Sequence, residues 1–228
     1  MTSLGPVALT HILVGRARPF GPNGEPSAID KRHSTGPLSL TVTGVTGDEQ
    51  GDPRNHGGPE KAVHHYPSEH YAAWRSHLPV PTAARLRIGA FGENFATTGL
   101  TEENTCIGDV FRLGNARIQV SQARQPCWKL NVRFGQADMA RLVQEHARTG
   151  WYYRVLEPGE VAPGDELRLL DRPSPDWPLR RLLHHLYVDP LNTEGLAGLV
   201  ALETLADSWR ELALGCVTPQ YPGSRSTL

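Results

Sequence analysis

The chain has 228 residues, 39% of them hydrophobic, which is enough for one sizeable domain with a small appendage or for two small domains. Its 23 basic and 24 acidic side chains nearly balance, which argues against a protein held to nucleic acid by bulk charge or to a membrane by a polybasic anchor. The 23 glycines and 19 prolines are scattered, which favours short strands joined by turns over a bundle of long helices.

The first half of the chain predicts short strands, one helix and one long loop. The glycine-rich stretch 46–59 shows no periodicity, which is typical of a functional or mobile loop. A helix is predicted over 67–78, because Pro67 stands at its start and apolar residues follow at helical spacing. Strands are expected over residues 7–14, 27–30, 38–45 and 91–96.

The second half continues the β pattern to residue 171 and then becomes helical. A hairpin around Gly114-Asn115, a helix and a closing strand pair are expected over residues 109–122, 136–146 and 151–170. Three prolines in residues 172–178 predict a linker, and three helical patterns follow it at 179–186, 193–201 and 205–214. We therefore predict a β-rich domain, a linker, a three-helix module and a polar, frayed tail over residues 1–171, 172–178, 179–216 and 217–228.

The three cysteines, Cys106, Cys127 and Cys216, lie far apart and form no CxxC pair. Zinc ribbons and thioredoxin-type motifs are therefore excluded. The odd number of cysteines and an apolar N-terminal stretch with no preceding Lys or Arg indicate a cytoplasmic protein with reduced thiols. No apolar run approaches the ~20 residues that a membrane-spanning helix needs.

The stretch SQARQPCWKLN, residues 121–131, is the densest candidate for chemistry, because it places Cys127 just after a predicted strand. Arg124 and Lys129 flank the thiol, and nearby cations favour the thiolate, which is both a nucleophile and a soft metal ligand. Taken alone, an inert half-buried cysteine is the somewhat better interpretation of this stretch, because free cysteines are commonly buried.

A second candidate is the stretch HGGPEKA, residues 56–62, in which two glycines allow backbone amides to approach an anion and Lys61 adds a point charge. It matches neither a Walker loop nor a dinucleotide-binding glycine motif, and by itself it is better interpreted as an ordinary turn. The histidines His64, His65 and His70 show no metal-ligand spacing, so we expect surface or hydrogen-bonded structural roles for them.

Seven motifs nevertheless occur in one order, and this ordered set resembles the MOSC domain family. Within that family the chain is most similar to the YiiM-type bacterial proteins, which carry a three-helix module behind the MOSC domain. The motifs extend over nearly the whole of residues 1–171, and the tail behind Cys216 departs from the pattern. They are GEPSAIDK, GDEQ, HGGPEKAVHHYPSEHY, FGEN, GLTEEN, GDVFRLGNARIQVSQARQPCWKLN and GWYYRVLEPG.

The resemblance implies a mainly β fold with helices, namely a MOSC-type β-barrel with peripheral helices and a small C-terminal three-helix module. It also implies the molybdenum cofactor, in which molybdenum is bound to molybdopterin, with Cys127 as catalytic residue and molybdenum ligand. We expect no pyridoxal phosphate. The cofactor cradle that the resemblance implies consists of Ser27, Lys31, Asp48, His56, Gly57, Lys61, Asn94 and Arg124.

The activity that the resemblance implies is reduction of N-hydroxylated compounds such as hydroxylaminopurines or amidoximes. No flavin, haem or iron–sulfur motif is present in the sequence, so a separate electron-donor reductase is expected as partner. Two alternatives stay open: a carrier of cofactor or sulfur with a persulfide on Cys127, and a metal-free cysteine hydrolase with His56 as base. The outer faces of the three helices could serve homodimerisation or partner docking, and the sequence does not choose between them.

Overall fold

The computed structural model describes residues 4–217, and these build a closed β-barrel with helices around one end. Seven strands follow one another around the barrel in the order β13-β9-β10-β11-β7-β8-β1, and β1 pairs again with β13 to close it. The short strand β4 adds to the free end of β1. Within the described residues the paired strands are antiparallel, except that β7 and β8 run parallel.

The barrel strands are β1 (Val7–Val14), β7 (Val63–Pro67), β8 (Phe95–Thr97), β9 (Val110–Leu113), β10 (Ala116–Ala123), β11 (Trp151–Glu157) and β13 (Glu166–Asp171). The smaller sheets and the edge strand are β2 (Arg18–Phe20), β3 (Glu25–Ser27), β4 (Arg32–His33), β5 (Leu38–Thr41), β6 (Gly44–Val45) and β12 (Gly159–Val161). The helices are α1 (Pro53–His56), the 3-10 turn η1 (Pro59–Lys61), α2 (Glu69–His77), α3 (Val80–Ala83), α4 (Lys129–Phe134), α5 (Met139–Glu145), α6 (Leu179–Tyr187), α7 (Thr193–Val200) and α8 (Asp207–Val217).

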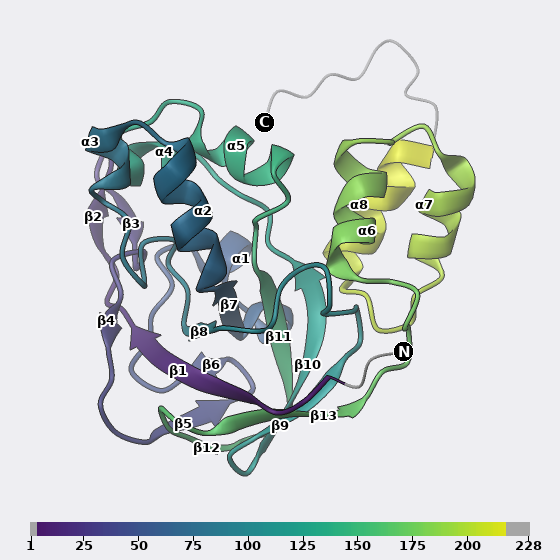
Figure 1. Cartoon of the computed structure of the whole chain (residues 1–228), viewed down its shortest axis with the longest axis horizontal. Helices are drawn as coiled ribbons and strands as arrows, with labels where there is room; N and C mark the ends of the chain where they lie inside the picture. The colour runs from purple at the N-terminus through teal and green to yellow at the C-terminus, as the bar shows by residue number, and fades with distance from the viewer. Residues whose placement is uncertain (1–3, 218–228) are drawn as a thin grey trace.

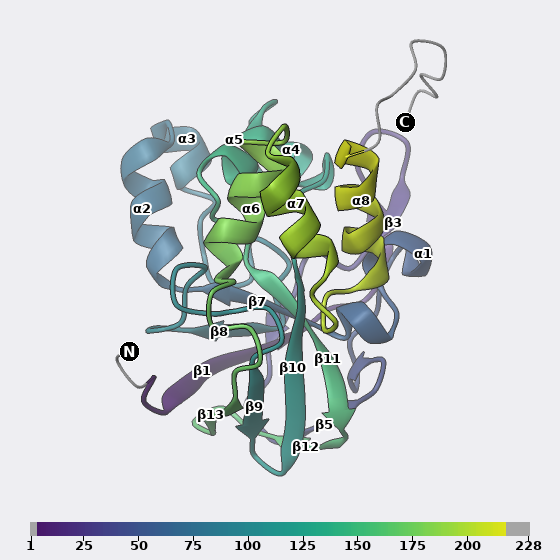
Figure 2. The ribbon, with the colours of Figure 1, turned by 90° about the vertical axis from the view of Figure 1, so that its right-hand side faces the viewer.

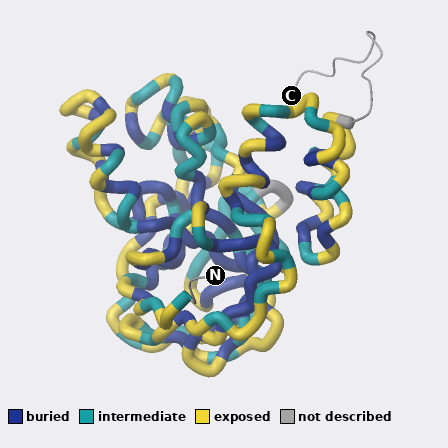
Figure 3. Tube along the Cα trace, turned by 45° about the vertical axis from the view of Figure 1, so that its right-hand side comes forward, coloured by how far each residue is buried: buried dark blue, intermediate teal, exposed yellow. Residues whose placement is uncertain are grey.

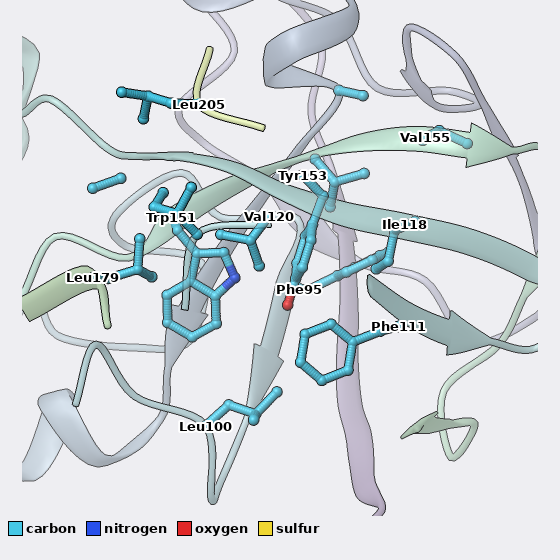
Figure 4. Close-up of a cluster of buried hydrophobic side chains, with 14 of the residues drawn as sticks. Phe95, Leu100, Phe111, Ile118, Val120, Trp151, Tyr153, Val155, Leu179 and Leu205 are labelled. Atoms are coloured by element: carbon cyan, nitrogen blue, oxygen red, sulfur yellow. The ribbon is translucent and has the colours of Figure 1, made fainter. Parts of the chain in front are cut away.

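The barrel interior is filled by aromatic and β-branched side chains, the types that strands favour. Phe95, Phe111 and Trp151 are fully buried there and meet side chains from β10 and β11 (Figure 4). The same cluster continues into the inner faces of α6, α7 and α8, through Leu179, Leu199 and Trp209, and includes Leu205 between α7 and α8. Figure 3 shows buried stretches on the inner sides of these helices and exposed stretches on their outer sides.

A second cluster lies under α2, α4 and α5, on the side of the barrel away from α6–α8 (Figure 1). Tyr66 stacks on Phe91 with ring centroids 4.2 Å apart, and Trp74 donates to the Tyr66 hydroxyl at 2.7 Å. Glu93 is buried beside them and accepts hydrogen bonds from the Tyr71 hydroxyl and from two backbone amides. The FGEN motif therefore contributes a structural glutamate that holds the turn before β8.

Residues 172–178 were predicted as a linker, and in the structure they are fastened to the barrel. Arg172 donates to both carboxylate oxygens of the buried Asp109, at 2.8 and 2.7 Å. The amide of Ile107 donates to the carbonyl of Trp177 at 3.0 Å, and the amide of Leu179 donates to the carbonyl of Thr105 at 2.9 Å. The division of the chain into separate domains stays a prediction, because barrel and helices share one apolar cluster.

The elements of the hairpin, the closing strands and the three C-terminal helices are close to their predicted positions, whereas several others differ. The predicted strand over 38–45 is wrong as a single element, because β5 and β6 are joined by a tight turn. Thr41 Oγ1 stabilises this turn by donating to the Gly44 carbonyl at 2.9 Å. The short strand expected over 27–30 is in fact β3, which ends at Ser27.

The helix predicted from Pro67 begins at Glu69, because Pro67 ends strand β7. All five β7 residues are buried, so the strand lacks the alternation that would have revealed it in the sequence. Residues 91–94 form a turn, and β8 begins only at Phe95. The predicted tail from Thr218 lies outside the described residues. No helix in the described range has the length and apolar character needed to cross a membrane.

Candidate functional site

A cavity that is open to solvent lies where β10 and β11 meet the loops around residues 27–31 and 48–51. Strand β10 ends at Ala123, and Arg124 continues the pairing by donating its amide to the Gly150 carbonyl at 3.0 Å. The chain then turns into α4, where the amide of Leu130 donates to the Cys127 carbonyl at 3.0 Å. This turn brings Cys127 to the cavity wall, where it is half-buried.

The structure brings eight of the nine predicted site residues to this one cavity. Gly57 does not line it and lies beside it, between α1 and η1. The residues come from separate parts of the chain, and only the fold brings them together. They are Ser27, Lys31, Asp48, His56, Lys61, Asn94, Arg124 and Cys127.

Lys31 and Asp48 form a buried ion pair in the cavity wall. Both carboxylate oxygens of Asp48 lie 2.5 Å from Lys31 Nζ. The same carboxylate accepts from the Gly15 amide at 2.7 Å and from Asn94 Nδ2 at 2.8 Å. Burial lowers the pKa of Lys31, and the charge of Asp48 opposes that shift. Asp48 thus serves Lys31 and the loop backbone, and Asn94 ties this pair to strand β7 by accepting from the His64 amide at 3.1 Å.

Three basic side chains on the cavity wall have buried nitrogen atoms that meet no hydrogen-bond partner within residues 4–217. They are Arg124 through Nη1, His64 through Nε2 and His56 through Nδ1. Buried polar groups are nearly always paired, so orphaned nitrogens that face a cavity point to a ligand. Two of them belong to side chains that are almost completely buried, Arg124 at 6% and His64 at 4% exposure.

The histidines of the cavity are held in the neutral form. Burial, together with the charges of Lys129, Arg124 and Lys61, lowers the pKa of His56 to about 4. Burial likewise places the pKa of His64 well below its ordinary value, with Arg124 acting in the same direction. Burial raises the pKa of Tyr152, the next side chain along the wall. The cavity therefore combines permanent cations with neutral hydrogen-bonding groups.

Glycine permits the close packing on which this wall depends. A Cβ on Gly51 would lie 2.2 Å from the Pro26 carbonyl oxygen and 2.5 Å from the Ser27 amide nitrogen. The loop that carries Asp48 is thereby packed directly against β3. On the other side, Lys129 fixes the same strand by donating from Nζ to the Pro26 carbonyl at 2.9 Å. The glycine at position 51 is thus required by backbone contact.

The predicted cradle left out His64 and Tyr152, which also line the cavity, and Lys129 was expected only as a cation beside the Cys127 thiol. Tyr152 lies between the core residues Trp151 and Tyr153 on β11, so strand alternation turns it away from the barrel interior. That alternation was a usable signal. His65, by contrast, is a structural histidine, since it lies 2.9 Å from Thr97 Oγ1 and stacks on Trp151. His70 pairs with the buried Glu102 at 2.7 Å.

Comparisons with known proteins agree with this architecture. The family model described as the MOSC domain matches residues 52–168, and the one described as the YiiM-like, 3-alpha helix domain matches residues 177–214. Protein YiiM of Escherichia coli (strain K12) is 43% identical over 189 residues, which cover 82% of this chain and 83% of that protein. The crystal structure of YiiM from Geobacillus stearothermophilus superposes with a TM-score of 0.79 at 30% identity, covering 93% of this chain and all of that one.

A longer relative carries a functional name. A protein of Gibberella moniliformis (strain M3125 / FGSC 7600) named "Reductase" is 41% identical over 174 residues, which cover 75% of this chain but 31% of the fungal protein. The similarity to that protein, like the others, extends over most of this chain. With its seven-stranded barrel, its C-terminal helices and two matching domain models, the chain belongs to the MOSC domain family and carries the YiiM-like three-helix domain.

Proposed function

We propose that this protein is a molybdenum-cofactor-dependent oxidoreductase that reduces N-hydroxylated compounds, with Cys127 as the molybdenum ligand and a separate reductase as electron donor. The observation that carries the proposal is the orphaned Nη1 of Arg124, buried in the wall of the cavity that Cys127 lines. Membership of the MOSC family and the similarity to a protein named "Reductase" support the same activity.

The donor set of the cavity fits such a cofactor. Molybdopterin carries a phosphate, and an anion of this kind needs cations and hydrogen-bond donors in a partly desolvated site. Arg124 offers an unpaired guanidinium nitrogen in the part of the chain that the structure describes, and a guanidinium can bind phosphate through two parallel bonds. Lys61 and Lys129 line the same cavity and add positive charge. The thiolate of Cys127 would supply a soft sulfur ligand of the kind that molybdenum binds.

The molybdenum cofactor, when bound, supplies the two-electron chemistry of oxygen removal. The overall reaction takes one N-hydroxylated molecule, two electrons and two protons and gives the amine and water. Arg124 and Lys61 would hold the phosphate, while Lys31 is kept in place by Asp48. His56 and Tyr152 are neutral at physiological pH, so they orient polar groups by hydrogen bonding without repelling a cation or an anion.

Metal content and turnover of matched cysteine variants test the proposal. The full chain, produced in a host that makes molybdenum cofactor, is expected to contain about one molybdenum per chain and to reduce an amidoxime with a chemical reductant. Cys127→Ser should lose both metal retention and turnover, whereas Cys216→Ser, an exposed cysteine on α8, should keep both. Full turnover in Cys127→Ser would contradict the proposal.

The same preparation separates the two alternatives. Intact mass spectrometry that finds an added sulfur atom on Cys127, with no molybdenum and no turnover, would favour a sulfur carrier. Hydrolytic activity in metal-free protein that disappears in both Cys127→Ser and His56→Gln would favour a cysteine hydrolase.

A further inference from the structure

A second hollow lies outside the cavity and is continuous with it, because Cys127, Lys129, Tyr152, His56 and Lys61 line both. Its other wall comes from helix α8, through Ser208 and Trp209. Figure 2 shows α8 on the same side of the molecule as α1 and β3, which supply the opposite wall. We call this hollow, between α8, the end of β10 and the β3–α1 side, the outer groove.

Helix α8 is docked at this place by contacts with β10. The amide of Ala206 donates to the Ser121 carbonyl at 2.9 Å, just before the helix begins. Ser208 Oγ donates to Gln122 Oε1 at 3.1 Å. Trp209 is 3% exposed and packs into the apolar cluster of the barrel and helices. The outer groove is therefore a product of the three-helix module and would lose one wall without it.

Gln122 is the unexplained polar residue of the outer groove. It is fully buried at 0% exposure and lines the groove, yet its Nε2 meets no hydrogen-bond partner anywhere in the described range 4–217. Its oxygen is already occupied by Ser208, so what the side chain still offers is an N–H donor. Leaving such a donor buried without a partner costs free energy, which a ligand that carries an acceptor would recover.

The groove also offers a flat aromatic surface and no preferred charge. Trp128 lines it and is 42% exposed, with its indole resting on Gly21, where a Cβ would lie 2.9 Å from the ring. Indole rings bind planar heterocycles by stacking. Two carboxylates, of Glu25 and Asp52, and two ammonium groups, of Lys61 and Lys129, line the groove. Because these charges balance, the groove favours a neutral ligand over an ion.

We propose that the outer groove is the substrate-binding site of this protein, that Trp128 stacks on a neutral planar substrate, and that the Gln122 amide donates to a ring acceptor beside the reacting nitrogen. This inference rests on the proposed function, because Cys127 at the inner end of the groove marks where the reaction takes place. Gln122 is then a positioning residue that selects heteroaromatic rings over carbocyclic rings of equal size.

A matched pair of small ligands tests the inference without turnover or metal. Aniline and 2-aminopyrimidine are neutral planar amines of nearly equal size, and only the latter has ring nitrogens that flank the amine. Titration calorimetry on the full chain should show 2-aminopyrimidine binding about three- to tenfold more tightly than aniline, the worth of one hydrogen bond. In Gln122→Leu this ratio should fall to about one.

Further variants separate binding from folding. Gln122→Leu removes an unsatisfied buried donor but also the acceptor of the Ser208 hydrogen bond, so its unfolding midpoint should stay close to that of the wild type, whereas a purely structural role would lower it clearly. Trp128→Ala should weaken both ligands about fivefold or more. Gln144→Leu on α5, outside the groove, is the control and should change neither affinity nor ratio. An unchanged ligand ratio in Gln122→Leu would overturn the inference.

The two proposals fail in different ways. Loss of the ligand ratio in Gln122→Leu supports the groove even if the protein never binds molybdenum. Molybdenum-dependent turnover, together with equal binding of both ligands by the wild type, supports the proposed function and overturns the assignment of the groove.

Discussion

Lys31 and Asp48, 17 positions apart in the chain, form an ion pair with side-chain exposures of 7% and 3%. The pair connects the loop after β3 to the loop after β6. Asp48 also accepts from the Gly15 amide behind β1. A buried ammonium needs an anion, and here the anion simultaneously fixes the backbone on which it depends. The folded protein thus holds the Lys31 ammonium group in the cavity wall before any ligand binds.

Removing Asp48 should destabilise the protein strongly. Asp48→Ala leaves Lys31 buried without its counter-ion, so the free energy of unfolding should fall by about 3–5 kcal/mol in chemical denaturation. The double variant Lys31→Met/Asp48→Ala removes the isolated charge and should recover part of that loss. Strictly additive losses in the two single variants and the double variant would contradict this account.

Arg124 should matter for ligand binding more than for folding. Its buried Nη1 meets no partner among residues 4–217, so Arg124→Met should change the free energy of unfolding by no more than about 1 kcal/mol. The same variant should retain much less molybdenum, measured by metal analysis, because the proposed phosphate contact is lost. Arg124→Lys should retain an intermediate amount, since Lys supplies charge without the planar fork. Full metal retention in Arg124→Met would remove Arg124 from the cradle.

Gly51 should not tolerate even a methyl group. A Cβ there would meet the Pro26 carbonyl oxygen at 2.2 Å, so Gly51→Ala must push the loop of Asp48 away from β3. We expect a loss of about 2 kcal/mol or more in unfolding free energy, together with weaker cofactor retention. Gly36→Ala is the matched control, because a Cβ at Gly36 has nothing within 4 Å, and its stability should equal that of the wild type.

Arg172 should stabilise the connection between barrel and helices. Burial raises the pKa of Asp109 and Arg172 opposes this, so Arg172→Ala leaves a carboxylate at 0% exposure without its cation. The unfolding free energy should drop by about 3 kcal/mol, as for other broken buried pairs. Arg168→Ala removes an exposed pair with Glu166 and should cost less than about 1 kcal/mol. Equal losses in the two variants would show that burial of Asp109 does not matter.

The neutral His56 should make the protein less stable in mild acid. Its pKa is about 4 in the folded protein against an ordinary 6.5, so the unfolded chain binds the proton more readily between these values. The resulting stability is complete above pH 6.5 and is lost as the pH falls toward 4. Comparing His56→Gln with the wild type should show a difference of about 1–2 kcal/mol across this range, allowing for solvent screening at a partly exposed side chain. Parallel pH curves for the two proteins would contradict the neutral assignment.

Much of the fold could be predicted, because strand patterns and turn residues act locally. Gly114-Asn115 joins β9 to β10 as expected, and the three C-terminal helices begin within two residues of their predicted starts. Strand β7 could not be found this way, since burial of both its faces removes the alternation on which the prediction depends. The ordered motifs identified the family that the comparisons then confirmed.

The candidate site could be predicted only in part. The resemblance named Cys127, Arg124 and Lys31, and all three line one cavity. Residues that are far apart in the sequence meet in the cavity only because the barrel closes, and no local sequence pattern predicts such contacts. Gln122 illustrates the limit: its role follows from the unpaired Nε2 and from Ser208, 86 positions further along the chain.

The contacts that hold residues 172–178 on the barrel affect how the protein unfolds and which truncations it tolerates. With one apolar cluster running from Phe111 in the barrel to Leu199 in α7, heat should disassemble both parts in a single calorimetric transition. A truncated protein that ends before Leu179 would expose the apolar surface of the barrel that the three helices cover, and we expect it to aggregate. A shortened version of this protein should therefore lose residues from surface turns and keep the three C-terminal helices.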